Sequence, residues 1–295
     1  MNIISEITRG VFFMQPDVAR QYYPLVLGLL TGKLLMGENH LAEDSRSQQC
    51  QIITKDNASL ETQPGSILTE NPDSIKENSI FSLSLVGPIT KYVQWCGPSG
   101  TRSKAAVLKM ADQNPGIVAH ILRIDSGGGE GYAAQELASF LKTLEKPVFA
   151  FVEGMAASAA YLIASACSMV AASSPMDRVG SIGTYVTLAD YSRWYDMQGV
   201  RLVDVYASGS KDKNRDYLEA IAGNTQKVQQ VVDTFNDFFL QSVRENRSES
   251  LDITSDDWST GKMFFAREAL GTGLIDIVLG FDDFLNNILD HITKP

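Results

Sequence analysis

Residues 147–164 read PVFAFVEGMAASAAYLIA, an apolar run that passes through Gly154 into a series of small, helix-forming residues. The pattern predicts a buried strand over 147–152 and a helix that begins about Ala156. Ser158 then lies at a sharp turn between strand and helix, close to free N–H groups and the positive end of the helix dipole. Because both features favour developing negative charge, the position suits a nucleophile.

A second strand upstream runs into a glycine loop. Residues 121–129 read ILRIDSGGG, in which apolar strand-forming residues precede glycines that leave the backbone amides accessible. We expect the oxyanion of a reacting carbonyl to be bound by the backbone N–H of Gly128 or Gly129 together with that of Ala159. The sequence therefore offers two sources of amide donors for one carbonyl oxygen.

Strands and helices alternate along the middle of the chain, which is the pattern of βαβ units. We predict strands at 80–86, 117–124, 147–152, 169–172 and 201–206, and helices at 103–112, 132–144 and 225–245. The alternation indicates an α/β protein with a mostly parallel sheet and right-handed crossovers. Function in such sheets gathers at the carboxyl ends of the strands, where Gly128 and Ser158 are expected.

Ser158 requires a base, and none of the three histidines is suitably placed to complete a Ser–His–Asp triad. His120 lies within an apolar strand and is expected to be a core residue. His40 lies in a polar stretch, and His291 is close to the C-terminus. Lysine is the remaining base, provided that burial keeps its amine neutral, because a free lysine has a pKa near 10.4, about 3 units too high for neutral pH.

Two lysines follow the predicted strand at 201–206. Lys211 and Lys213 lie on a loop, where the adjacent Asp212 raises and Arg215 lowers the pKa of a neighbouring lysine. The local sequence therefore does not distinguish between them. For either lysine, the ordinary alternative is a solvated surface side chain.

In this order and spacing, the motifs resemble those of peptidase family S49, the family of the signal peptide peptidase called protease IV, within the Clp/crotonase superfamily. The matching segments are IDSGGG at 124–129, MAAS at 155–158, VGSIGT at 179–184 and SGSK at 208–211. The resemblance covers about residues 81–284. The chain departs from the family pattern at Gly127, which replaces a proline, and at 159–160, where two alanines replace glycines.

The resemblance implies an α/β, Clp/crotonase-like fold of repeated βα units, in a single-half member of the family. It also implies a serine peptidase without cofactor or metal, which forms an acyl-enzyme on Ser158. Lys211 would be the general base, and Ser181 would hydrogen-bond the lysine amine. The substrates would be peptides or proteins, and the expected assembly is a homo-oligomeric ring in which Ser158 and Lys211 come from one subunit or from two neighbours.

Several functions stay open within this resemblance. The leading one is a phage or prophage head-assembly protease, and the alternative is a cellular signal-peptide peptidase. A crotonase-type enzyme would act on acyl-CoA thioesters with carboxylates such as Glu130 and Glu153, which leaves Ser158 and Lys211 unexplained. An inactive scaffold that retains the fold is the non-enzymatic alternative.

Composition limits the kinds of partner that the protein could bind and indicates its cellular compartment. The chain has 295 residues, a formal net charge of −10 and a pI near 4.8, which argues against a nucleic-acid-binding surface. Cys50, Cys96 and Cys167 show no paired or metal-binding spacing, so we expect free thiols, a reducing compartment and no metal site. The expected location is the cytoplasm, with association to the virion during head assembly in the phage case.

The apolar stretch at 22–36 (YYPLVLGLLTGKLLM) resembles a membrane anchor but is interrupted by Pro24 and Lys33 and is too short for a span. We therefore expect no stable membrane anchor. The chain divides into an N-terminal helical arm at 1–36, a polar, flexible linker at 37–79, the peptidase domain at 80–285 and a C-terminal tail at 286–295.

Overall fold

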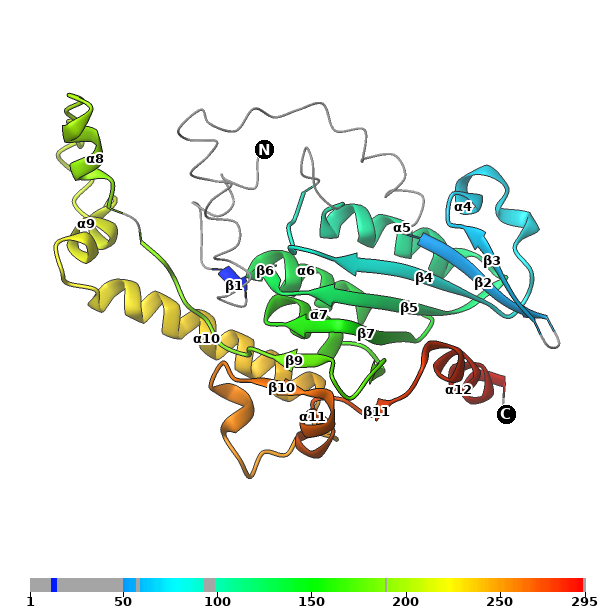
Figure 1. Ribbon diagram of the computed structural model, residues 1–295. Coiled ribbons are helices and arrows are strands. Elements are labelled where there is room, and N and C mark those ends of the chain that lie inside the picture. The colour runs from blue at the N-terminus through cyan, green and yellow to red at the C-terminus, as the bar shows by residue number, and fades with distance from the viewer. Residues whose placement is uncertain (1–11, 15–49, 57–58, 93–98, 189, 294–295) are drawn as a thin grey trace.

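A computed structural model of the chain describes residues 12–14, 50–56, 59–92, 99–188 and 190–293 (Figure 1). Its strands are β1 (Phe12–Met14), β2 (Cys50–Asp56), β3 (Ser59–Pro64), β4 (Ser79–Val86), β5 (Ile117–Ser126), β6 (Gly128–Glu130), β7 (Val148–Ala157), β8 (Met169–Ala172), β9 (Arg178–Gly180), β10 (Met263–Phe265) and β11 (Ile277–Val278). Its α-helices are α4 (Ile67–Glu70), α5 (Thr101–Gln113), α6 (Gly131–Leu141), α7 (Ala159–Ser165), α8 (Ser192–Met197), α9 (Arg215–Ile221), α10 (Gln226–Asn246), α11 (Ala266–Thr272) and α12 (Phe281–Thr293). Short 3-10 helices span Pro72–Ser74 and Asp257–Ser259.

The main sheet has the strand order β10-β9-β7-β5-β4-β2-β3, with β8 paired to β7 and β11 paired to β8. The pairs β4–β5, β5–β7, β7–β8, β7–β9 and β8–β11 are parallel. The pairs of β2 with β3 and β4, and of β9 with β10, are antiparallel. The prediction of an α/β protein with a mostly parallel sheet is therefore confirmed.

Both faces of the central strands are covered, which explains the near-continuous apolar runs of β4, β5 and β7. On one face, Leu83 and Leu122 belong to a core shared with α5, α6 and α7. On the other face, Phe149 and Phe151 pack against Phe284 of α12. The strands are thus held between two layers, and their carboxyl ends carry the loops that form the candidate site.

Residues 50–79 differ from the flexible linker predicted at 37–79. β2 and β3 form a hairpin, and β2 pairs with β4 at the edge of the main sheet. Ile52 and Ile53 are buried in the cores on the two faces of the sheet, and Leu68 of α4 joins the core of Ile52. Because polar residues surround these few apolar side chains, the sequence pattern did not predict the edge hairpin. Residues 1–11 and 15–49 of the predicted N-terminal arm and linker lie outside the described residues.

The predicted C-terminal tail at 286–295 also differs from the structure. α12 continues through Thr293, and Ile288 is buried in the same core as Phe284 and Leu285. These apolar residues lie at helical spacing, so one stripe of the helix packs against the sheet. The predicted boundary at 285 divided this stripe.

His120 is a core residue, as predicted. Its side chain is fully buried, its Nε2 lies 3.1 Å from Oδ1 of Asp112, and its ring packs edge-on against Phe81. Burial lowers the pKa of His120, and the carboxylate of Asp112 opposes that change. His120 is therefore a packed histidine beneath the sheet surface and does not reach Ser158.

Residues 201–206 form no strand, contrary to the prediction. They lie between α8 and α9 in a part of the chain that we call the extension (residues 185–224, of which residue 189 is not described), and Val205 is 90% exposed. Figure 1 shows α8 and α9 projecting beyond the end of α10, away from the sheet. Among the strands that the structure describes, none lies beside this segment to pair with it. The predicted helix at 225–245 is confirmed as α10.

A buried lysine in α5 gives the fold a testable pH dependence. Lys104 is 3% exposed, and its Nζ donates a hydrogen bond of 2.7 Å to the carbonyl oxygen of Ser84. Burial lowers the pKa of Lys104 to about 8 from an ordinary value of 10.5, against a smaller opposing effect of Cys50. At a pH between these two pKa values, the unfolded chain binds more protons than the folded one, so the free energy of unfolding rises with pH. Below pH 8 the lysine is charged in both states, and the full cost of burying the charge is present.

Replacing Lys104 with methionine is therefore expected to raise the free energy of unfolding at pH 7 by about 2 kcal/mol, since the charge is removed and one hydrogen bond is lost. The gain should shrink as the pH approaches 10. Urea unfolding at pH 7 and pH 9.5 measures it. Lys109→Met on the exposed side of the same helix is the control, and a Lys104→Met protein that is no more stable than this control at pH 7 contradicts the expectation.

Candidate active site

Ser158 occupies a strained turn between β7 and α7. β7 ends at Ala157 and α7 begins at Ala159, and the backbone of Ser158 has φ 54° and ψ −117°. Its N–H donates to the carbonyl oxygen of Gly180 at 2.8 Å, and its carbonyl oxygen accepts from the N–H of Leu162 at 2.9 Å. Such backbone angles persist when the surroundings hold them, and they are common at active sites.

The hydroxyl of Ser158 is buried and forms no hydrogen bond with the described residues. The residue is 1% exposed, and its Oγ is one of the few buried side-chain oxygens without a partner in this part of the chain. A buried hydroxyl without a partner is uncommon, because it forgoes the hydrogen bonds that water would provide. The side chain is therefore placed for a partner that the described part of a single chain does not supply.

The glycine loop is held by Ser126 and Ile89. The Ser126 hydroxyl donates to the carbonyl oxygen of Gly87 at 2.6 Å and accepts from the N–H of Gly128 at 3.1 Å. The N–H of Ile89 donates to Gly128 O at 2.9 Å, and Ile89 O accepts from the N–H of Glu130 at 2.8 Å. The amide of Gly128 is thus already engaged within the loop.

The amide of Gly129 points to the opposite edge of β6. Backbone groups of successive residues in a strand alternate in direction. Because Gly128 O and the Glu130 N–H both face Ile89, the N–H and C=O of Gly129 face away from it. A Cβ atom on Gly129 would lie 2.1 Å from Ile89 O, which explains why the close approach of these two backbones requires glycine. Of the two glycines considered as donors, Gly129 is the one whose N–H faces outward.

Strand pairing brings the glycine loop beside the nucleophile. Ser126 at the end of β5 lies opposite Ala156 near the end of β7, and β6 contacts α7. Ala159 is the first residue of α7, and its N–H is therefore among the donors that a helix leaves without intrahelical partners. The structure thus brings Ser158, Gly129 and Ala159 together at the carboxyl end of the sheet, where parallel sheets carry their sites.

Ser181 is also placed next to Ser158. It follows β9, whose Gly180 lies opposite Ala157 of β7 and accepts the hydrogen bond from Ser158. Ser181 is 6% exposed with φ 51°, and its N–H donates to Lys262 O at 2.8 Å. The two serines therefore directly follow adjacent strands, with their backbones fixed.

Asp177 holds the turn before β9, the strand that leads into Ser181, and the sequence analysis missed this role. Its carboxylate accepts from the Ser173 hydroxyl at 2.8 Å, the Ser174 N–H at 3.0 Å and the Gly154 N–H at 3.0 Å. It thereby ties the start of β9 to the bend in β7. An aspartate three residues after a serine is a frequent turn signal, and only the fold shows that this turn supports the nucleophile.

The candidate lysines are not near Ser158 in the single chain. Lys211 and Lys213 are both exposed on the extension, just before α9. Since Ser158 Oγ has no partner among the described residues, neither amine forms a hydrogen bond with it. The structure therefore brings Ser158 and Ser181 together and leaves the predicted base apart from them.

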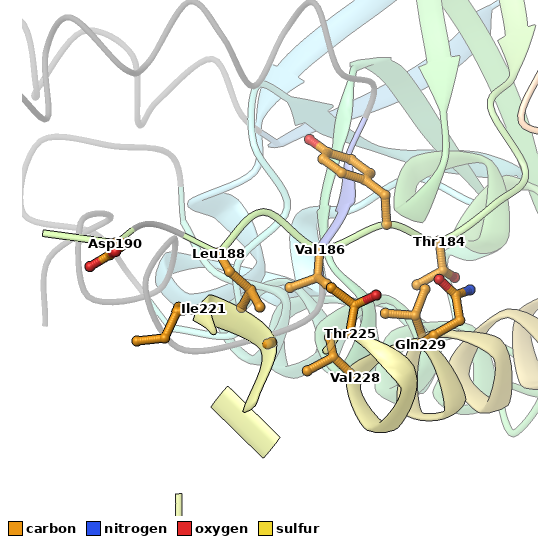
Figure 2. Close-up of a pocket in the computed structure, with 11 residues that line it drawn as sticks. Thr184, Val186, Leu188, Asp190, Ile221, Thr225, Val228 and Gln229 are labelled. Carbon is orange, nitrogen blue, oxygen red and sulfur yellow. The ribbon is translucent and has the colours of Figure 1, made fainter. Parts of the chain in front are cut away.

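A cavity of about 520 Å³ lies beyond Ser181, between the start of the extension and the helices α9 and α10. Figure 2 shows Val186 and Leu188 on one side of it and Ile221 and Val228 on the other. The N–H of Thr184 at its inner end donates to Asn236 Oδ1 of α10 at 3.1 Å. Neither Ser158 nor Ser181 lines this cavity, so it is separate from the candidate site.

Within the described ranges, no group of three or more histidine, cysteine, aspartate or glutamate side chains is arranged to hold a metal ion. Of the helices in the same ranges, none combines the length and the apolar character that a membrane crossing demands. The apolar stretch at 22–36 lies outside the described residues.

Comparison with known proteins gives relatives that are named as proteases. Capsid assembly protease C of Escherichia phage lambda is 25% identical over 221 residues, which are 73% of this chain and 50% of that protein. Protease 4 of Haemophilus influenzae is 25% identical over 230 residues, 74% of this chain and 36% of that protein. Among solved structures, a ClpP1 mutant from Listeria monocytogenes has a TM-score of 0.46 and 13% identity, over 74% of this chain and 99% of that chain.

The chain spans about half the length of the curated relatives it matches. The model of "Peptidase family S49" matches residues 141–292, just over half of the chain. The matched segment contains the turn of Ser158, the turn of Ser181 and the lysine loop. By this match and these relatives, the chain belongs to peptidase family S49.

Proposed function

We propose that this protein is a serine peptidase that hydrolyses peptide bonds through an acyl-enzyme on Ser158. The observation that carries the proposal is the buried Ser158 hydroxyl, which is held at a strained turn next to the glycine strand β6 and has no hydrogen-bond partner among the residues that the structure describes. The described part of the fold does not use this hydroxyl. A nucleophile that must meet both a base and a substrate requires that freedom.

Lys211 is the general base and acid in this proposal. Its neutral amine takes the proton from Ser158 Oγ as the oxygen attacks the substrate carbonyl carbon, and gives it to the nitrogen of the leaving peptide. The resulting ester is cleaved by a water molecule that transfers a proton to the same amine. Attack by the water oxygen releases the carboxylic acid and returns the proton to Ser158.

The backbone amides of Gly129 and Ala159 stabilise the oxyanion of both steps. The outward direction of the Gly129 N–H and the engagement of the Gly128 N–H by Ser126 favour Gly129 over Gly128. Ser181, which follows the strand paired with the end of β7, hydrogen-bonds the lysine amine in this proposal and directs its lone pair toward Ser158 Oγ. No cofactor takes part in the proposed mechanism.

The lysine comes from a neighbouring subunit of a homo-oligomeric ring. Two observations support this arrangement: Ser158 Oγ lacks a base among the described residues, and the extension that carries Lys211 projects from the sheet. The extension also exposes large apolar side chains, with Met197, Leu202 and Val203 each about two thirds exposed. Several large apolar side chains exposed on one segment favour a protein interface, and in the proposed ring a neighbour packed there buries the lysine.

The biological setting that we propose is a cytoplasmic, phage-type protease that is associated with the virion during head assembly. The similarity to a protein named capsid assembly protease favours this setting. The alternative is a cellular signal-peptide peptidase, which the similarity to protease 4 keeps open. The two settings share the same site chemistry.

Digestion of a defined peptide mixture, read by mass spectrometry, tests the proposed activity. We expect products with new termini, and in the presence of an added amine we expect the acyl group to be transferred to that amine, because an acyl-enzyme accepts either nucleophile. Chelation of divalent metals should leave the products unchanged. Turnover of acyl-CoA thioesters without peptide cleavage would instead identify a crotonase-type enzyme, and no turnover of either class would favour an inactive scaffold.

Gly129→Ala is expected to lower kcat for peptide hydrolysis by about 100-fold or more, the usual cost of losing one oxyanion donor. The added Cβ meets Ile89 O at 2.1 Å, so β6 must shift and its amide leaves the carbonyl. Gly271→Ala is the control, because a Cβ there meets no atom within 4 Å outside the neighbouring turns of its own helix α11. Steady-state kinetics of both variants measure the effect, and a Gly129→Ala enzyme with unchanged kcat contradicts this choice of donor.

A further inference from the structure

A short segment near the N-terminus lies along the outward edge of the glycine strand. β1 pairs with β6 in antiparallel register, with Phe12 opposite Glu130, Phe13 opposite Gly129 and Met14 opposite Gly128. Figure 1 shows β1 beside β6, next to the end of the sheet that carries α7. Three residues of the chain thus form an added strand at the candidate site.

The register determines which groups of β1 bind β6. Gly128 O and Glu130 N are used by Ile89, so the N–H and C=O of Gly129 are the groups that face β1. In an antiparallel ladder, the residues opposite one another exchange both hydrogen bonds or neither. Phe13 is therefore the bonded partner, with its carbonyl facing the Gly129 N–H and its own N–H facing the Gly129 carbonyl. The N–H of Phe12 and that of Met14 point away from β6.

This arrangement coincides with the way in which an extended peptide adds to a sheet edge. We propose that β1 is an internal competitor of the substrate: it holds the peptide-binding edge of β6, with the Phe13 carbonyl at the Gly129 amide, and a substrate must displace it before Ser158 can act. The inference rests on the proposed peptidase function. It identifies the occupant of the edge as the chain's own Phe12–Met14.

Its short length makes β1 a weak competitor that a substrate can replace. The strand is only three residues long and lies at an edge, so a longer substrate strand forms more ladder bonds and displaces it. Attachment to the same chain gives β1 a high effective concentration, which compensates for its short length.

Proline substitutions at neighbouring positions test the proposal with a matched control. Phe13→Pro removes the N–H that faces the Gly129 carbonyl, whereas Phe12→Pro removes an N–H that points away from β6, a position where an edge strand tolerates proline. We expect Phe13→Pro to lower KM for an added peptide about fivefold or more with kcat unchanged, because a larger fraction of the enzyme has a free edge. Phe12→Pro should stay near the wild-type KM.

A binding measurement separates this inference from the proposed activity. A labelled peptide with the sequence of residues 10–17, GVFFMQPD, is titrated by fluorescence polarisation against full-length Ser158→Ala protein with and without Phe13→Pro. We expect tighter binding, by the same factor as the change in KM, when Phe13→Pro is present. If Phe13→Pro tightens peptide binding but the wild-type protein cleaves no peptide, the result would support β1 as the occupant of the edge. It would then contradict only the proposed peptidase activity.

Two results would overturn the proposal while leaving the peptidase function intact. One is an active enzyme whose KM and peptide affinity are the same with proline at position 12 and at position 13. The other is wild-type protein that accumulates a new N-terminus at Met14, which mass spectrometry of the intact chain detects. Cleavage there would show that the Phe13–Met14 bond is a substrate of the site.

Discussion

Peptide hydrolysis is expected to fall by at least about a thousandfold when Ser158 is replaced by alanine, because loss of the nucleophile removes the covalent route and leaves only the oxyanion donors and binding. Folding should change little. The Ser158 hydroxyl has no hydrogen-bond partner among the described residues, so its removal breaks no bond that the structure shows. Alanine also experiences the same backbone strain at φ 54° as serine does.

Ser165→Ala is the matched control, since it makes the same change on the same helix. The Ser165 hydroxyl donates to Leu162 O at 2.8 Å and accepts from Asn246 Nδ2 at 2.9 Å. This variant should therefore lose stability, by about 1 kcal/mol per buried hydrogen bond, while it keeps its activity. Mass spectrometry of the products should show loss of cleavage only in Ser158→Ala, and thermal unfolding should show loss of stability only in Ser165→Ala. Products that persist in Ser158→Ala would place the nucleophile elsewhere.

The central strands and helices follow from the sequence because their apolar runs are long. β4, β5 and β7 are buried on both faces, and α10 repeats its apolar residues at helical spacing. The edge hairpin β2–β3 was not predictable in this way, because its core contribution rests chiefly on Ile52 and Ile53 within a polar stretch. Short edge elements carry too little pattern to be distinguished from a loop.

The candidate site also contains some residues that the sequence predicts and others that it does not. Ser158 and Ser181 were predictable from motifs at the ends of strands, and strand pairing then brings them together. The roles of Asp177 and Ser126 depend on hydrogen bonds between segments distant in sequence, which no local pattern encodes. The pairing of β1 with Gly129 likewise depends on a tertiary contact of only three residues.

The strand predicted at 201–206 is absent from the single chain, and the assembly that we propose offers a physical reason for this. Leu202, Val203 and Val205 have the residue types of a strand, yet they are 66%, 69% and 90% exposed in the single chain. A strand needs a partner for its backbone groups. In the proposed assembly, a neighbouring subunit that packs on the extension would supply such a partner, and the same contact would bring Lys211 to the Ser158 of a second subunit.

Alanine at Lys211 is accordingly expected to lower kcat by at least about a thousandfold, comparable to the loss of Ser158, since the nucleophile and its base act as a unit. Lys213→Ala is the matched control and should change kcat less than about threefold, because an exposed side chain outside the site contributes little. Both lysines are exposed in the single chain, so neither change should reduce the thermal stability of the subunit. The reverse result would make Lys213 the base.

Mixing two inactive variants then decides whether the site is shared. Ser158→Ala and Lys211→Ala proteins are unfolded together, refolded as a mixture and assayed, with each variant refolded alone as the control. If the lysine comes from a neighbour, a random equal mixture pairs an intact Ser158 with an intact Lys211 in about one site in four, and about a quarter of the wild-type activity returns. If both residues act within one subunit, every site in the mixture lacks one of them and no activity returns. Wild-type protein that is fully active as a monomer by light scattering would also exclude the shared site, because the Ser158 hydroxyl would then have acquired its base from within its own chain.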